Sequence, residues 1–206
     1  MQWDKLANDK TISKTISALN LNGIDALVVD TAEEAKKKVL EMVPKKAEIM
    51  QMTSVTADTA GISEVINNSG NYNSVRNKLN KLDRTKDHVE MQKLGAAPEW
   101  AIGSVHAITE DGKVIIASNT GSQLPAYAYG SSHVIWVVGT QKIVKNLDDA
   151  MTRIYDYVLP LETPRLRKAY NLPDTVHSNV SKLLIINREI TKGRIAVIFV
   201  KEKLGF

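Results

Sequence analysis

The start of the chain alternates between helical periodicity and short apolar runs, and this alternation restricts the fold more than any other feature. A helical pattern over residues 4–20 is followed by the apolar run 24–29. Thr31 and Glu34 then have the spacing of a capping box, which predicts a second helix, and the apolar run 48–52 predicts a second strand. Alternating helices and strands are typical of a parallel sheet covered by helices. The sequence therefore predicts an α/β fold.

Later segments add antiparallel features to this pattern. Two β-rich stretches within residues 100–119 flank Asp111-Gly112, a pair that favours the tight turn of a β-hairpin. The run 134–138 predicts another buried strand, and segments 183–186 and 195–200 predict a closing hairpin or two neighbouring strands. We expect a mixed, largely parallel sheet flanked by helices.

Two further regions have helical patterns. Residues 61–94 predict several short helices, and an amphipathic helix begins near Leu147. Pro160 is expected to end that helix, because proline lacks the N–H that a helix interior requires. The segment that follows, 161–171, is predicted to be an exposed loop or a docking surface for an acidic partner. Its basic residues are Arg165, Arg167 and Lys168.

The composition is that of a folded domain. The chain has 206 residues, of which 43% are hydrophobic and 24% charged, so it can bury a substantial core. We expect one domain over residues 1–206, with a helix–strand–helix part over 1–45. The net charge of +4 is compatible with nucleic-acid binding, but the basic stretches have acidic neighbours and no interleaved aromatic residues. We predict solvated helix faces and no nucleic-acid partner.

The chain contains no cysteine, which excludes a disulfide, a thiolate nucleophile and an iron-sulfur cluster held by its own sulfurs. Its four histidines lack the spacing of metal ligands, so we predict no metal and no cofactor bound by this chain. The sequence shows neither the apolar segment of a secretory signal nor an apolar run long enough to cross a bilayer. We expect a cytoplasmic protein with no membrane partner, and a homo-oligomer is left open.

The most informative polar segment is the loop over residues 119–125. Thr120 and Gln123 fit a capping box, and a helix is expected to begin here. Free N–H groups at a helix start, together with nearby hydroxyls, suit a phosphate or a carboxylate. The candidate ligand-binding residues are Thr120, Gly121, Ser122 and Gln123. An ordinary cap without a ligand explains the same residues.

A second polar loop follows the predicted strand over 48–52. Open α/β sheets bind ligands beyond the carboxyl ends of their strands, so two such loops at one edge would hold a small molecule between them. The candidate residues here are Thr53, Ser54 and Thr56. Capping alone also accounts for this loop.

Three further residues complete the candidate site. Ser104 and His106 alternate on one face of the first strand of the predicted hairpin, and His106 is a candidate proton carrier. A histidine bonded to the backbone or to Glu110 is an equal alternative. Lys142 follows a strand and offers a cation, although a solvated charge is also possible there. The Rossmann, Walker and G-x-S-x-G motifs are absent, which disfavours the familiar nucleotide and hydrolase chemistries.

An ordered series of segments resembles the LUD-domain family. They are MTSVT at 52–56, AIGSVHA at 101–107, ASNTGSQLPAY at 117–127 and VGTQKIV at 138–144, with further similarity over 157–162 and 183–188. The resemblance is clearest over residues 46–206. It implies a fold similar to the glucosamine-phosphate deaminase/ribose-phosphate isomerase group, whose members bind small anions in loops at strand ends.

The resemblance also implies a link to the oxidation of L-lactate to pyruvate. In that system a protein of this kind acts with iron-sulfur proteins, and a chain without cysteine fits a non-cluster subunit. We therefore expect a non-cluster subunit of an L-lactate utilization system that binds a small anionic ligand, with iron-sulfur clusters on partner proteins. Two alternatives stay open, which are a stand-alone enzyme for a phosphorylated or acyl substrate and a ligand-sensing protein without turnover.

Overall fold

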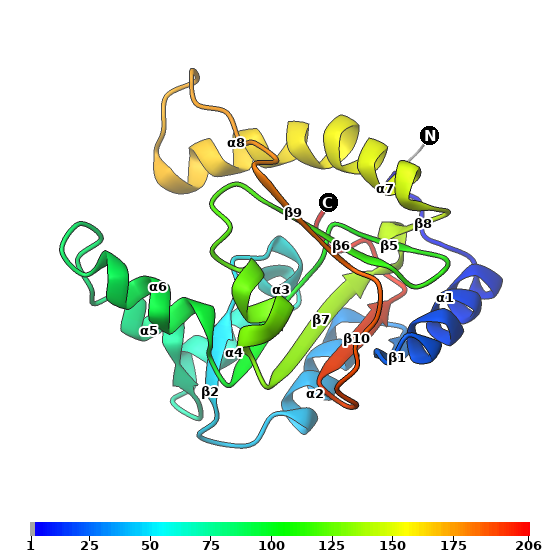
Figure 1. The fold of residues 1–206 in the computed structure, drawn as a ribbon, viewed down its shortest axis with the longest axis horizontal. Coiled ribbons are helices and arrows are strands. Elements are labelled where there is room, and N and C mark those ends of the chain that lie inside the picture. The colour runs from blue at the N-terminus through cyan, green and yellow to red at the C-terminus, as the bar shows by residue number, and fades with distance from the viewer. Residues whose placement is uncertain (1–2) are drawn as a thin grey trace.

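A computed structural model describes residues 3–206, and its centre is a six-stranded sheet. The strand order is β1-β10-β7-β4-β2-β3, and every neighbouring pair is parallel (Figure 1). This confirms the predicted α/β class. The strands are β1 (Asp25–Val29), β2 (Glu48–Gln51), β3 (Asn73–Ser74), β4 (Trp100–Gly103), β7 (His133–Gly139) and β10 (Ile195–Val200).

Both faces of this sheet are covered at its centre, which explains why the central strands β4, β7 and β10 are almost continuously apolar. In β7, Ile135 packs on one face and Trp136 on the other, as the two-residue period of a strand requires. The Ile135 face is covered by α2 (Ala32–Met42), α3 (Val55–Thr59) and α4 (Ile62–Asn68). The Trp136 face is covered by α1 (Asp9–Leu21), α5 (Val75–Leu79), the π-helical turn η1 (Ala126–Gly130) and a second sheet. The predicted capping box of Thr31 and Glu34 begins α2.

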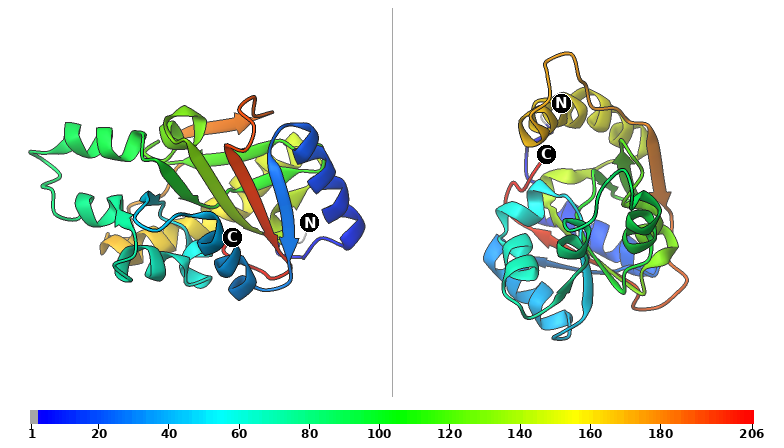
Figure 2. Two further views of the ribbon diagram at one scale, coloured as in Figure 1. Left: turned by 90° about the horizontal axis from the view of Figure 1, so that it is seen from below. Right: turned by 90° about the vertical axis from the view of Figure 1, so that its left-hand side faces the viewer.

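The second sheet has four strands in the order β8-β5-β6-β9. Its inner side packs on the large sheet, and its outer side packs on the long helical segment that begins with α7 (Figure 2). It therefore forms a layer between the large sheet and that helix. The strands are β5 (Ala107–Thr109), β6 (Val114–Ser118), β8 (Ile143–Val144) and β9 (Lys182–Ile186).

The predicted hairpin over residues 100–119 is shorter than expected. Its turn is correct, because Gly112 has a φ of 82° and its N–H donates to Thr109 O. The antiparallel pair, however, is only β5 with β6, whereas residues 100–103 form β4 inside the parallel sheet. As a consequence, Ser104 and His106 lie in the connection between the two sheets.

The expected closing pair of strands near the end of the chain is also wrong. β9 pairs with β6 in the small sheet, while β10 lies between β1 and β7 in the large sheet. An apolar run predicts a strand but does not identify its neighbour, which is set by long-range packing.

The helix that Pro160 was expected to end continues to Tyr170. It consists of α7 (Leu147–Arg153), a π-helical turn η3 (Ile154–Val158) and α8 (Leu159–Tyr170). In the π turn the N–H of Leu159 donates to Ile154 O, and the widened turn accommodates Pro160 directly after it. Residues 161–170 are therefore helical and do not form the predicted loop.

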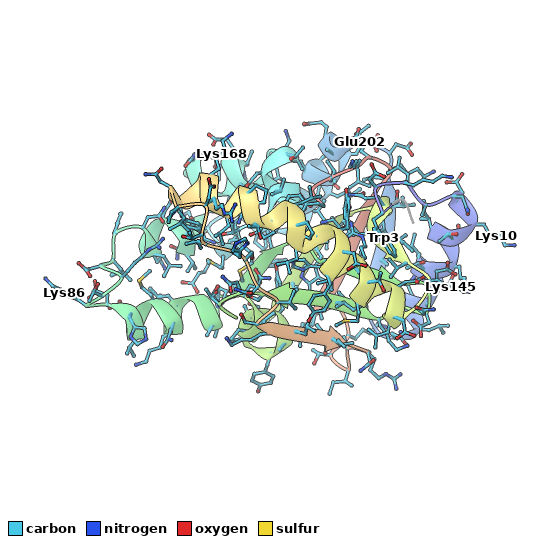
Figure 3. The ribbon with its side chains drawn as sticks, turned by 90° about the horizontal axis from the view of Figure 1, so that it is seen from above. Trp3, Lys10, Lys86, Lys145, Lys168 and Glu202 are labelled. Carbon is cyan, nitrogen blue, oxygen red and sulfur yellow. The ribbon has the colours of Figure 1, made fainter. Side chains whose placement is uncertain are left out.

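The short helices expected over residues 61–94 are present, and part of them projects from the body. Lys86, between α5 and α6 (His88–Ala96), lies at the tip of this projection, while Lys10 on α1 lies at the opposite end (Figure 3). Within residues 3–206, no helix combines the length and apolar character that crossing a bilayer requires.

Candidate functional site

The polar loops that follow β2, β4 and β6 meet at a cavity of about 1070 Å³. α8 and the end of the chain around Gly205 also contribute to its wall. Every predicted site residue lines this cavity, so the two polar loops do converge. These residues are Thr53, Ser54, Thr56, Ser104, His106, Thr120, Gly121, Ser122, Gln123 and Lys142.

Lys142 is the buried charged residue among them, with only 3% of its surface exposed. The short 3₁₀ helix η2 (Thr140–Lys142), which follows β7, carries it. Nζ donates to Thr56 Oγ1 at 3.1 Å, Ser104 Oγ at 3.2 Å and Val105 O at 3.1 Å. Burial, together with the nearby charge of Arg153, lowers the pKa of Lys142 to about 7. Lys142 is thus a buried cation whose hydrogen-bond partners in the described chain are all neutral.

The loop after β2 supplies both structural and cavity-facing groups. Ser54 caps α3 by accepting from the Ala57 N–H at 3.3 Å, as the capping alternative required. The buried Thr56 hydroxyl donates to Leu204 O at 3.1 Å. Thr53 is exposed, and its Oγ1 accepts from Arg76 Nη2 at 3.3 Å. This part of the wall therefore combines hydroxyls with a cation that the sequence did not indicate.

His106 is held in one tautomer. Its Nδ1 accepts from the Ala117 N–H at 3.1 Å, so the neutral ring carries its hydrogen on Nε2. Burial, with the charges of Lys142 and Arg153, lowers the pKa of His106 to about 3. The alternative partner Glu110 pairs with Lys14 instead, at 2.7 Å. At neutral pH His106 therefore offers an N–H donor, and proton transfer by this residue stays a prediction.

The depressed pKa of His106 predicts a specific loss of stability in mild acid. An unfolded histidine titrates near 6.5, so below that pH the unfolded chain binds a proton that the folded chain excludes. As the pH is lowered from 6.5 towards 3, His106 should therefore reduce the free energy of unfolding by about 1.4 kcal/mol per pH unit. When the pH falls from 7 to 5, the free energy of unfolding measured in urea should decrease by about 2 kcal/mol less in His106→Gln than in the wild type. Equal losses would mean that His106 protonates normally.

The Thr120 loop differs from the predicted capping box. Thr120 Oγ1 accepts from the Ser122 N–H at 3.3 Å, and Gln123 Nε2 donates to Ala117 O at 3.3 Å. The Gly121 N–H donates to Ser118 Oγ at 2.9 Å. Two N–H groups that were expected to be free for an anion are therefore occupied by hydroxyls. The exposed side chains of Thr120 and Ser122 are what this loop presents to a ligand.

Arg153 lies behind the cavity wall, and no sequence motif pointed to it. Its side chain is completely buried at the end of α7, and its Nη1 donates to His106 O at 2.5 Å. Nε and Nη2 are buried without a hydrogen-bond partner among the described residues. Burial lowers the pKa of Arg153 to about 10. Its only sequence signal is a position three residues after the buried Ala150, on the stripe of the helix that faces the small sheet.

The remaining wall is also rich in basic groups. Arg76, Arg84 and Arg165 line the cavity, and Glu162 pairs with Arg165 at 2.5 Å. The cavity therefore has an excess of positive charge, which favours an anionic ligand. Across residues 3–206, no three histidine or acidic side chains come together as metal ligands, and the expectation of no metal remains a prediction.

Comparison with known proteins identifies the family. The family model for the LUD domain matches residues 12–200, which is most of the chain. The chain belongs to the LUD domain family. A solved structure with a similar fold is that of a DUF162 family protein from Deinococcus radiodurans, which superposes with a TM-score of 0.57 at 10% identity. The match covers 95% of this chain and 99% of that one.

The structural match supports the fold of this LUD domain and nothing about its ligand. No curated protein matches the chain in a sequence search. Evidence on the chemistry of this LUD domain comes from its own cavity, which Lys142 and His106 line and behind which Arg153 is buried.

Proposed function

We propose that this LUD domain is a non-cluster subunit of an L-lactate utilization system and binds a small carboxylate at Lys142. The family is associated with lactate utilization. A Cys-ligated iron-sulfur cluster has no ligands in a chain without cysteine, so such clusters would be on partner proteins. The observation that supports an anionic ligand is the environment of Lys142, whose buried ammonium is bonded only to neutral oxygens.

A bound carboxylate compensates the charge of Lys142. Burying an ammonium costs free energy unless an anion accompanies it, and the described residues provide none in contact with Nζ. In the protonated state, Lys142 donates to Ser104 Oγ, which leaves the Ser104 hydroxyl hydrogen free to donate to a ligand. His106 Nε2–H is a second donor at the same cavity. A 2-hydroxy or 2-oxo acid matches this set of donors.

The ligand class is tested by thermal stabilisation with L-lactate, pyruvate and the neutral analogue lactamide at pH 6, where Lys142 is protonated. Both acids should raise the melting temperature of the wild type by several degrees, and lactamide should not. Lys142→Met should abolish the shift. Lys145→Met, which removes an exposed lysine, should retain it. Equal shifts in the two variants would exclude Lys142 from the site.

The subunit role needs a separate test. Tagged protein from native cells grown on lactate should co-purify with iron-sulfur proteins, and the captured material should oxidise lactate anaerobically. If the protein is recovered alone and extracts lacking it oxidise lactate at the same rate, the lactate role is wrong even if the cavity binds anions.

The size of the cavity favours one alternative. Its volume of about 1070 Å³ lies at the upper limit of the 300–1,000 Å³ typical of pockets for drug-sized ligands, and lactate is far smaller. Arg76, Arg84 and Arg165 extend the basic wall beyond Lys142. A larger phosphorylated or acyl compound fits this extent, as either a substrate or a sensed ligand. Stabilisation by such compounds but not by lactate would favour this alternative.

A further inference from the structure

The hydrogen bonds of Lys142 fix the direction from which its side chain accepts a proton. Nζ lies 3.1 Å from Thr56 Oγ1, 3.2 Å from Ser104 Oγ and 3.1 Å from Val105 O. The Val105 carbonyl can only accept, and the Thr56 hydroxyl already donates to Leu204 O. Both groups must therefore accept an N–H of Lys142. The ammonium form gives its third N–H to Ser104.

The neutral amine has one hydrogen fewer, and the same partners determine where the lone pair lies. Thr56 and Val105 accept both remaining N–H groups, so the lone pair of Nζ faces Ser104 Oγ. The Ser104 hydroxyl then donates its hydrogen to this lone pair. Loss of one proton from Lys142 thus converts Ser104 from an acceptor into a hydroxyl that is hydrogen-bonded to a base.

We propose that Ser104 and Lys142 form a nucleophile–base pair that accepts an acyl group from an ester or thioester of a small carboxylic acid. Ser104 Oγ bonds to the carbonyl carbon, and its proton moves to Lys142 Nζ. The bond to the alcohol or thiol then breaks, and this leaving group takes the proton from Nζ. Water attacks the acyl-serine by the same proton transfers, which releases the acid and restores the hydroxyl.

The surroundings suit this reaction. Ser104 is partly exposed to the cavity at the end of β4, whereas Lys142 is buried behind it. Arg153 from α7 and His106 from the connection after β4 are the charged or titratable groups that act on Lys142 or lie beside it, and burial with Arg153 holds the pKa of Lys142 at about 7. The amine is therefore available as a base near neutral pH. A lysine base from η2 does not require the G-x-S-x-G turn that the sequence lacks.

This inference rests on the proposal that the cavity binds a small carboxylate or its acyl derivative, but it concerns the neutral state of Lys142. Anion binding uses the ammonium and should be strongest below pH 7. Acyl transfer uses the amine and should increase above pH 7. The two proposals can therefore fail separately.

The first test is covalent modification by diisopropyl fluorophosphate at pH 8.5, followed by intact mass and peptide mapping. The wild type should gain one adduct on Ser104. Ser104→Ala and Lys142→Met should lower the rate at least about 100-fold, which is the usual contribution of a general base. Ser132→Ala, which removes an exposed serine outside the cavity, should react like the wild type. No adduct in the wild type, or the same rate in Ser104→Ala, would overturn the proposal.

A second variant tests the pair without relying on turnover. Ser104→Cys introduces the only thiol of the chain, and its reaction with iodoacetamide can be followed against pH. The midpoint of this pH dependence reports the pKa of the thiol, and Lys142 should hold it below the ordinary value of about 8.5. Adding Lys142→Met should raise the midpoint by at least about one pH unit. An unchanged midpoint would show that the two residues are not coupled. Loss of anion stabilisation with normal Ser104 reactivity would instead contradict only the proposed function.

Discussion

Replacing Arg194 by methionine is expected to lower the free energy of unfolding by about 3–5 kcal/mol, the usual cost of removing one partner of a buried ion pair. The side chains of Arg194 and Glu189 are only 8% and 10% exposed, and their charged atoms lie 2.6 Å apart. Arg194 Nε also donates to Ser131 O, and Nη2 donates to the carbonyls of Ala126 and Tyr127. The substitution leaves a buried carboxylate and these carbonyls without their donor.

Urea unfolding at pH 7 measures this loss, which should also lower the melting temperature by about 2–4 °C per kcal/mol in a chain of this length. Arg188→Met is the matched control, because Arg188 is exposed and its change should stay within about 0.5 kcal/mol. Adding Glu189→Leu to Arg194→Met should recover part of the stability, since the stranded carboxylate is then removed. A single variant as stable as the wild type would show that the pair contributes little.

Arg194 matters for the cavity as well as for the core. The carbonyls that it binds belong to the first two residues of η1, the turn that follows the Thr120 loop, and to Ser131 directly after it. Arg194 itself immediately precedes β10. One side chain therefore fixes the position of the loop relative to the large sheet. This role could not be predicted from the sequence, because Arg194 and the residues whose carbonyls it binds lie more than sixty positions apart.

The features that could be predicted from the sequence depend on interactions within a few residues. Thr31 and Glu34 form their capping box, and Gly112 adopts the left-handed turn that ends β5. Both are governed by local backbone chemistry, which a short segment contains in full. The alternation of helices and strands likewise identified the parallel sheet.

Strand partners could not be predicted in the same way. Residues 100–103 read as half of a hairpin because a turn signal follows them, yet all four are buried in the large sheet between β2 and β7. The turn signal before residues 195–200 likewise predicts pairing with residues 183–186, whereas β10 pairs with β1 and β7. Helix ends were similarly affected, since Pro160 is accommodated by a π turn that needs no sequence signature of its own.

The site was partly predictable because strand ends of a parallel sheet lie at one edge. That rule accounts for Thr53 and Ser104, which follow the neighbouring parallel strands β2 and β4. Thr120 follows β6 of the second sheet and lines the same cavity because the two sheets pack on each other. The burial of Lys142 depends on the loops after β2 and β4, which surround its Nζ, and the position of Arg153 depends on how α7 packs on the small sheet. Neither could be predicted from the sequence. The lowered pKa values of His106, Lys142 and Arg153 come from burial, which only the structure reveals.

Lys142 should make the stability of the fold rise with pH between about 7 and 9.5. The pKa of Lys142 is about 7 in the folded chain, whereas an unfolded lysine titrates near 10.4. Between these values the unfolded chain binds more protons, so the free energy of unfolding increases by up to about 1.4 kcal/mol per pH unit. Below pH 7 both states are protonated, and the folded state bears the full cost of the buried ammonium.

Lys142→Met should therefore be more stable than the wild type at pH 6, by a few kcal/mol, and should lose the rise above pH 7. Lys145→Met, which removes an exposed charge, should follow the wild-type curve. Urea unfolding at half-unit pH intervals measures the difference, and parallel curves for wild type and Lys142→Met would mean that Lys142 titrates normally. A bound carboxylate stabilises the ammonium, so saturating ligand should flatten the wild-type rise without changing the variant.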